Sequence, residues 1–229
     1  MMFSCFLVGQ EDINRNELIV GYHLGRNANA YTFDDIAKPF LDEGLGNYQG
    51  LDLDYIFYTK RNRILDFSYS FSFLNHSISP SNLVYEFGYN YDDDCCLKIG
   101  SALLMQGAVK FLLVFYDRNK IKLLGGAGIG LILDISSVSG GITYEGREIW
   151  SEYDTKKGPV ILPSYDISTQ LNYNLTKDYL LNVNLSFIHT PFNDLDFEYT
   201  ILSRDGIFRG SFYQKLSSVT LSIGLGKKL

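Results

Sequence analysis

Residues 165–175 read Tyr-Asp-Ile-Ser-Thr-Gln-Leu-Asn-Tyr-Asn-Leu, and this stretch decides the fold. Its odd positions are apolar or aromatic apart from one threonine, and its even positions are Asp, Ser, Gln and Asn. Because successive side chains of a β-strand point to opposite faces, this period of two predicts a strand with one apolar and one polar face. The stretches 181–187 and 218–226 repeat the pattern, and 51–59 and 65–73 show it in the first half. The chain is therefore predicted to be all-β.

The connections between these strands alternate between short and long. Short polar turns are expected at about 60–63, 117–120 and 176–178. Longer connections are expected at about 27–46, 79–100, 137–159 and 193–214. Short turns on one side and long loops on the other are typical of transmembrane β-barrels. With a first strand at about 18–25, the pattern predicts an eight-stranded antiparallel up-and-down barrel. The alternative is ten strands, if Gln106-Gly107 forms a turn.

The polar faces of the strands favour a membrane barrel over a soluble one. They carry mostly Ser, Asn, Thr, Gln and Gly, with few Lys or Glu, whereas the outer face of a soluble β-sandwich is charged. The apolar faces carry Tyr and Phe near several strand ends, as the interfacial girdles of membrane barrels do. We therefore predict a barrel surrounded by lipid in the outer membrane of a Gram-negative cell. The alternative is a soluble barrel that holds a ligand inside.

Length and composition exclude several other classes of protein. The chain has 229 residues, of which 46% are hydrophobic, and a formal net charge of −6. The apolar content excludes a disordered chain, and the acidic balance argues against nucleic acid as a partner. No apolar run approaches the ~18 residues of a membrane-spanning helix. We expect residues 1–16 to be a remnant of an export signal with a flexible N-terminus, and residues 17–229 to form one barrel domain.

The centre of the chain resembles a known family. Residues 107–116 (GAVKFLLVFY) and 121–130 (IKLLGGAGIG), joined by a polar turn, resemble the central hairpin of the small outer-membrane β-barrel proteins of Bacteroidetes, which include the PorT-like proteins. The pair at 165–175 and 181–189 also resembles theirs. The resemblance implies a barrel over residues 17–229 and no shared catalytic motif. PorT-like members are associated with type IX secretion, an association that this resemblance does not transfer.

The sequence departs from that family at two places. Ala108-Val109 stands where Ile-Pro is usual, and the chain ends in Lys227-Lys228-Leu229 rather than in an aromatic residue.

A group of polar side chains is predicted to point into the lumen. By strand parity, His23 shares the lumen face with a proposed network of Asp52, Asp54, Asp66, Lys110, Asp134, Asp166 and Gln170. Burying several carboxylates requires partners or shifted protonation. We interpret the network as a polar plug neutralised in part by Lys110, and a proton or cation site is the alternative. Eight strands leave no room for an open aqueous channel.

One long connection carries a candidate partner surface. Aromatic residues alternate along it at Tyr85, Phe87, Tyr89 and Tyr91, and such a ribbon suits contact with another protein. The Asp92–Asp94 and Cys95–Cys96 runs that follow lack the spacing of calcium or zinc motifs, so no metal site and no cofactor are predicted.

These patterns lead to a function hypothesis with one rival. We predict a non-enzymatic outer-membrane protein that acts through its extracellular loops or as an accessory subunit of a larger secretion or assembly complex. Its partners would be outer-membrane lipid and other outer-membrane or periplasmic proteins. Whether it is an enzyme is left open, because a lipid A-modifying hydrolase would need a His and a Ser, and His76 is followed by Ser77. Adjacent strand residues point apart, which is poor geometry for a catalytic pair.

Overall fold

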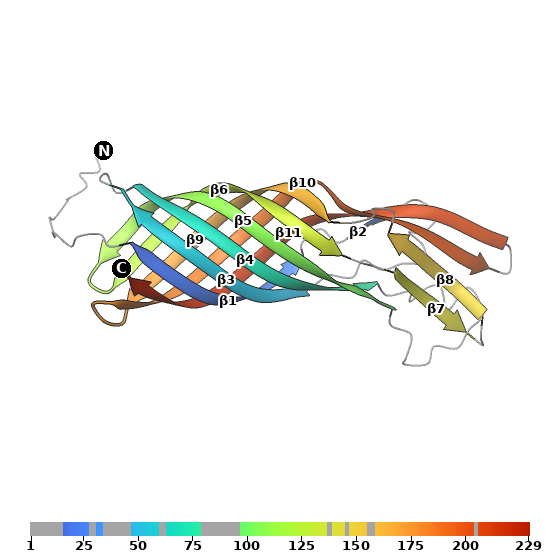
Figure 1. Ribbon diagram of the computed structural model, residues 1–229, viewed down its shortest axis with the longest axis horizontal. Helices are drawn as coiled ribbons and strands as arrows, with labels where there is room; N and C mark the ends of the chain where they lie inside the picture. Colours follow the sequence, from blue (N-terminus) through green and yellow to red (C-terminus); the bar gives the residue numbers. More distant parts are fainter. Residues whose placement is uncertain are drawn as a thin grey trace, which may run out of the picture.

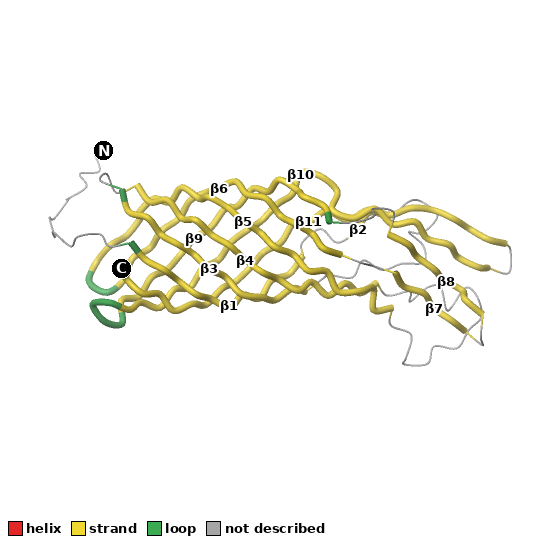
Figure 2. The backbone as a smooth tube through the Cα atoms, in the orientation of Figure 1, coloured by secondary structure: helices red, strands yellow, loops and turns green. Residues whose placement is uncertain are grey.

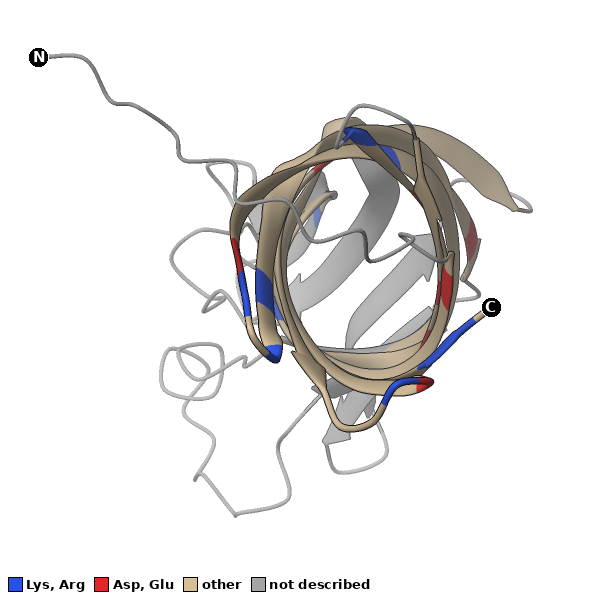
Figure 3. Cartoon of the chain, turned by 90° about the vertical axis from the view of Figure 1, so that its left-hand side faces the viewer, with Lys and Arg blue, Asp and Glu red and all other residues tan. Residues whose placement is uncertain are grey.

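The computed structural model describes residues 16–27, 31–33, 47–59, 63–78, 97–136, 139–144, 147–154, 159–203 and 206–229. Eight antiparallel strands form a closed barrel, which Figure 3 shows from one end and Figure 1 from the side. They are β1 (Glu17–Asn27), β3 (Asn47–Tyr58), β4 (Arg63–Ile78), β5 (Leu97–Arg118), β6 (Ile121–Ser136), β9 (Val160–Asn174), β10 (Tyr179–Ser203) and β11 (Gly206–Lys228). Pairing of β1 with β11, from Glu17–Lys228 to Asn27–Ser218, closes the ring.

The predicted eight-stranded barrel is confirmed, and the ten-stranded alternative is wrong. β5 runs unbroken through Gln106 and Gly107, which pair with Ser70 and Tyr69 on β4 and continue the ladder with β6. Gly107 faces outward into open space, so the glycine does not mark a turn.

Short turns join the strands at the end of the barrel that also carries the C-terminus, which we call the turn end (Figure 2). The β5–β6 turn consists of Asn119 and Lys120, and Asn119 has a φ of 57°. Asn tolerates this left-handed conformation better than most residues, which suits it to a tight hairpin. In the β9–β10 turn, the Thr176 hydroxyl accepts hydrogen bonds from the backbone N–H groups of Asp178 and Tyr179. We call the opposite end the loop end.

The connection expected at 193–214 is wrong, because β10 and β11 continue beyond the barrel as a paired hairpin. Their pairing extends from Asn193–Lys215 to Ser203–Gly206, after register shifts that follow His189. Three short strands join this hairpin: β8 (Arg147–Asp154) pairs with β10, β7 (Ser139–Tyr144) pairs with β8, and β2 (Tyr31–Phe33) pairs with β11. We call these five strand segments, in the order β2-β11-β10-β8-β7, the outer sheet. It projects from the loop end in Figure 1.

The two faces of the barrel wall differ as the alternation predicts. Along β9 the exposed and buried residues alternate without a break from Ile161 to Tyr173. Large hydrophobic side chains are exposed on the outward face of all eight barrel strands, with Ile129 at 67% and Ile167 at 61% exposed. Soluble proteins rarely expose so large and continuous an apolar surface to water, so the soluble-barrel alternative is wrong. No helix in the described part of the chain is long and apolar enough to cross a membrane.

Inside the barrel, apolar side chains gather at two levels. A turn-side cluster consists of Ile19, Ile56, Ile64, Leu112, Leu124 and Leu180. A loop-side cluster consists of Tyr48, Leu104, Ile132, Ile188 and Leu216. Inward positions of β5 run from Leu104 through Gln106 and Lys110 to Leu112, so polar side chains lie between the two clusters. Polar side chains therefore lie between the two apolar clusters, and a second buried polar group of Glu17, Asn172 and Asn182 lies at the turn end.

Candidate functional site

The residues predicted for the lumen network lie on the inward faces of five barrel strands. Asp52 is partly buried, with 15% of its side chain exposed. The other six are buried: Asp54, Asp66, Lys110, Asp134, Asp166 and Gln170. Their strands are held in register by the ladders described above, which fixes which of these side chains meet. We call the group formed by His23 and these residues, except Asp134, the polar centre.

Lys110 lies between two carboxylates. Its Nζ atom is 3.5 Å from Asp166 Oδ2 and 3.8 Å from Asp66 Oδ2. Asp66 and Lys110 are direct partners across β4 and β5, and Gly128 separates Lys110 from Asp166 in the same row of the wall. A Cβ atom at Gly128 would lie 2.8 Å from Lys110 Cγ, so the missing side chain leaves the space in which the lysine reaches Asp166.

Gln170 completes this group. Its Nε2 atom donates a hydrogen bond of 2.7 Å to Asp66 Oδ2. Three acceptor atoms nearby have no hydrogen-bond partner among the described residues: Asp66 Oδ1, Asp166 Oδ1 and Gln170 Oε1. Carboxylate oxygens outnumber the cationic donors that reach them, and this excess makes the polar centre acidic.

Asp134 lies in a different row of the wall from Lys110. It pairs with Leu104, which in turn pairs with Ser72, so its row is the one that contains His23. The sequence pattern placed all seven residues on one face, and only the strand register separates Asp134 from the lysine.

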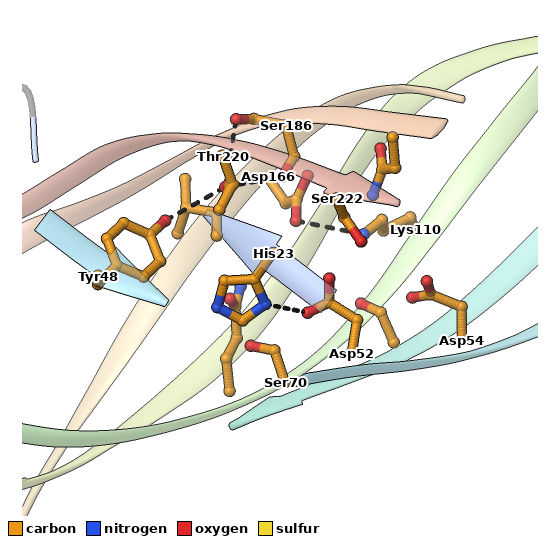
Figure 4. A pocket seen from close by; sticks show the side chains of 14 residues that line it. His23, Tyr48, Asp52, Asp54, Ser70, Lys110, Asp166, Ser186, Thr220 and Ser222 are labelled. Atoms are coloured by element: carbon orange, nitrogen blue, oxygen red, sulfur yellow. Dashed lines mark hydrogen bonds and ion pairs between the residues drawn. The ribbon is translucent and has the colours of Figure 1, made fainter. Parts of the chain in front are cut away.

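His23 forms a second group, which the sequence did not single out as a unit. Its Nδ1 atom is 2.7 Å from Asp52 Oδ1, and its Nε2 atom is 2.8 Å from Ser72 Oγ. The Asp52 contact is drawn in Figure 4. His23, Gly50 and Ser72 are consecutive partners in one row across β1, β3 and β4. Because Gly50 has no side chain, the imidazole can lie across β3 and reach Ser72.

A neighbouring aromatic residue holds the imidazole from the loop side. The ring of Tyr48 meets the ring of His23 edge-on, with centroids 5.7 Å apart. The Tyr48 hydroxyl donates a hydrogen bond of 2.6 Å to Ser218 Oγ and lies 3.2 Å from Thr220 Oγ1. His23 is therefore fixed on two sides, by packing and by two hydrogen bonds, which leaves it little rotational freedom.

Two small cavities adjoin these groups. One has a volume of about 30 Å³ and is lined by residues that include His23, Asp52, Asp54, Lys110 and Asp166 (Figure 4). The second has a volume of about 20 Å³ and is lined by Ser72 and by all five residues of the loop-side cluster. Tyr48, Ser70, Gln106 and Ile188 line both, so the cavities are neighbours. Volumes of this size hold about one or two water molecules each.

Other sequence predictions lie outside what the structure describes. The aromatic ribbon of Tyr85, Phe87, Tyr89 and Tyr91, the Asp92–Asp94 run and residues 1–15 are not among the described residues. His76 lies in β4 and pairs through its backbone with Ile99, but its side chain is not described. Within the described ranges, no group of His, Cys, Asp and Glu side chains is arranged to hold a metal ion.

Comparison with solved structures supports the fold. No protein-family model and no curated protein matches the sequence. The outer membrane protein OprG from Pseudomonas aeruginosa aligns with a TM-score of 0.57 at 9% identity, over 94% of this chain and 96% of that one. A major outer membrane protein from Thermus thermophilus aligns with a TM-score of 0.51 at 8% identity, over 93% of this chain and 99% of that one. At such low identity the likeness shows a shared barrel fold.

The fold and the surface together define the class of protein. A closed barrel satisfies the backbone of every strand internally, which lipid requires. The apolar outward faces of all eight strands match the lipid-facing band of outer-membrane barrels. The chain is therefore an outer-membrane β-barrel protein of a Gram-negative cell. By the usual orientation of such barrels, the turn end faces the periplasm and the outer sheet lies outside the cell.

Proposed function

We propose that this protein binds another protein through its outer sheet, as an accessory subunit of a larger outer-membrane complex. The observation that carries the proposal is the length of the last two strands. β10 has 25 residues and β11 has 23, whereas a tilted strand crosses the bilayer in about 9–11 residues. More than half of this hairpin is therefore not needed to cross lipid.

The outer sheet is also more ordered than a simple connection requires. Fixing each backbone residue costs about 1–2 kcal/mol of conformational entropy. A short loop would join β10 to β11 with fewer ordered residues than this paired sheet. Binding residues are commonly carried on segments held above a rigid scaffold. β7, β8 and β2 widen the hairpin on both sides, and this produces a broad surface rather than a narrow ribbon.

The sequence of the central hairpin does not decide the kind of complex. Residues 107–116 and 121–130 resemble those of PorT-like proteins of Bacteroidetes, whose members are associated with secretion. That association is not transferred by a resemblance in one hairpin, so a secretion complex and an assembly complex are both proposed as the setting. The aromatic ribbon at Tyr85, Phe87, Tyr89 and Tyr91 is a candidate for part of the same contact surface.

A truncation of the outer sheet tests the proposal. Residues 195–213 are replaced by Asn-Gly, which joins β10 to β11 near the rim of the barrel. The wild type, extracted from its membrane in mild detergent, should migrate as a discrete larger complex whose partner is identified by mass spectrometry. The truncated protein should migrate as a folded monomer.

A matched control changes the opposite end. Lys120→Gly alters the β5–β6 turn at the turn end and should leave the complex intact. A wild type that is monomeric in mild detergent, or a complex that survives the truncation, would contradict the proposal.

A further inference from the structure

We propose that Ser72, His23 and Asp52 form an acyl-transfer site inside the barrel, in which Ser72 is the nucleophile toward small carboxylic esters. This activity would be additional to partner binding and does not depend on the outer sheet. The three residues come from β4, β1 and β3, which are adjacent strands of the wall. Nucleophile, base and orienting carboxylate are recognised by geometry rather than by sequence order.

Hydrogen bonding fixes the role of each nitrogen of His23. Nδ1 lies 2.7 Å from Asp52 Oδ1, and an ionised carboxylate only accepts hydrogen bonds. Nδ1 therefore carries the proton, and in the neutral ring Nε2 is unprotonated. Nε2 then accepts the hydrogen bond of 2.8 Å from the Ser72 hydroxyl. This is the arrangement in which an imidazole can take the proton of a serine as it attacks.

The space beside Ser72 suits a small acyl group. Ser72 lines the cavity of about 20 Å³, whose walls include Leu104, Ile132 and Leu216. With the adjoining cavity of about 30 Å³, the space holds about three or four water-sized groups, which is the size of an acetyl group. The proposed substrates are therefore acetyl or similarly short esters of small alcohols, and long-chain lipid esters are excluded.

An unused hydrogen-bond donor faces the same space. Gln106 is 8% exposed and lines both cavities, and no described residue accepts a hydrogen bond from its Nε2 atom. Its strand partner is Ser70, two residues from Ser72 on β4. A buried donor without an acceptor is rare, and here it is available to the negative oxygen that forms when Ser72 attacks a carbonyl.

The reaction proceeds in two balanced steps. Ser72 Oγ bonds to the carbonyl carbon, and its proton passes to His23 Nε2. The ester C–O bond then breaks, and the alcohol leaves with that proton. A water molecule attacks the acyl-Ser72 ester with His23 again as base, and the carboxylic acid leaves as the Ser72 hydroxyl is restored. Asp52 takes up no proton in either step and stabilises the charged imidazole.

The test uses the full-length protein folded in detergent and two small reagents. Methanesulfonyl fluoride should form a bond from sulfur to Ser72 Oγ with loss of fluoride, which peptide mass spectrometry locates. Methyl acetate should be hydrolysed to acetate and methanol, which proton NMR measures. Ser72→Ala should abolish both reactions, and His23→Gln should slow both by about 100-fold or more. Gln106→Leu should slow the ester reaction by about 100-fold while the barrel stays folded.

Ser217→Ala is the matched control, because Ser217 is a buried serine that contacts a histidine, with its Oγ 2.6 Å from His189 Nδ1, but lines neither cavity. It should react like the wild type. Circular dichroism confirms that each variant is folded. A folded wild type in which neither reagent modifies Ser72 would overturn the proposal, as would equal labelling of the wild type and a folded His23→Gln variant. Those results would leave Asp52, His23 and Ser72 as a structural hydrogen-bond network.

Discussion

Val109 and Lys110 are neighbours on β5, yet one side chain is 44% exposed on the outer face and the other is 3% exposed in the lumen. On the outer face, lipid accepts any apolar side chain, because fluid acyl chains adapt to its shape. In the lumen, each polar side chain needs a specific partner, as Lys110 has in Asp66 and Asp166. On the outside of this barrel it matters only that a side chain is apolar, whereas on the inside each polar side chain depends on a particular partner residue.

The largest effect is expected from Lys110→Met. The change removes the cation between Asp66 and Asp166 and leaves buried carboxylates without their partner. We expect the barrel to lose about 3–5 kcal/mol of unfolding free energy, measured by urea unfolding in lipid vesicles. Lys120→Met, in the exposed β5–β6 turn, should change it by about 0.5 kcal/mol or less. Equal effects of the two substitutions would show that the lumen pairs are not important for stability.

A smaller effect is expected where the lumen is apolar. Leu112 is fully buried in the turn-side cluster, and Leu112→Ala should cost about 2–5 kcal/mol, because its neighbours cannot fill the cavity left behind. Leu113 faces outward on the same strand. Leu113→Ala should cost less, because lipid flows into the space. The same unfolding measurement compares them, and a larger cost at Leu113 would reverse the assignment of faces.

A charge on the outer face tests the other side of the comparison. Ile167 lies near the middle of β9 and is 61% exposed. Ile167→Arg should cost about 2–4 kcal/mol in a bilayer, because the cation enters hydrocarbon. Ile167→Phe keeps the chemical class and should change the unfolding free energy by about 0.5 kcal/mol or less. If the arginine variant is as stable as the wild type, this face does not contact lipid.

The smallest effect is expected from removing one hydroxyl. Tyr48→Phe deletes the donor to Ser218 without changing the packing against His23, and should cost about 1–2 kcal/mol. Tyr69→Phe makes the same chemical change on the outward face and should alter the unfolding free energy by about 0.5 kcal/mol or less. Loss of more at Tyr69 than at Tyr48 would contradict the distinction between the faces.

The sequence predicted the barrel well because its main signal is local. Alternation along 165–175 depends only on neighbours, so strand number, turn positions and the outward face followed directly from it. The same alternation is present at 195–202, which reads Leu-Asp-Phe-Glu-Tyr-Thr-Ile-Leu and continues β10 into the outer sheet, where a long connection is predicted instead. The period of two indicates a strand at these residues, whereas the usual loop lengths of membrane barrels predict a loop.

The contacts inside the lumen were harder to predict, because they depend on register between distant strands. His23 and Ser72 are 49 residues apart, and only the alignment of β1, β3 and β4 through Gly50 brings them together. A glycine at an inward position of the middle strand is the signal that could have found this contact. It leaves room for a side chain of one neighbouring strand to reach the other. Gly128 has the same role between Lys110 and Asp166. The sequence gives one indication of the two apolar clusters inside the barrel, which is the stretch 103–116 with apolar residues on both faces.

The closing seam between β1 and β11 also constrains the order of assembly. Tyr48 and Ser218 are 170 residues apart, and the hydrogen bond between them can form only after the last strand has been placed beside the first. Contacts so distant in sequence form slowly, because the intervening chain must first lose its freedom. Until the seam closes, the Lys110 group has an open side. The nascent barrel therefore has to be kept out of hydrocarbon, or held in a protected environment, until its carboxy-terminal strand is in place.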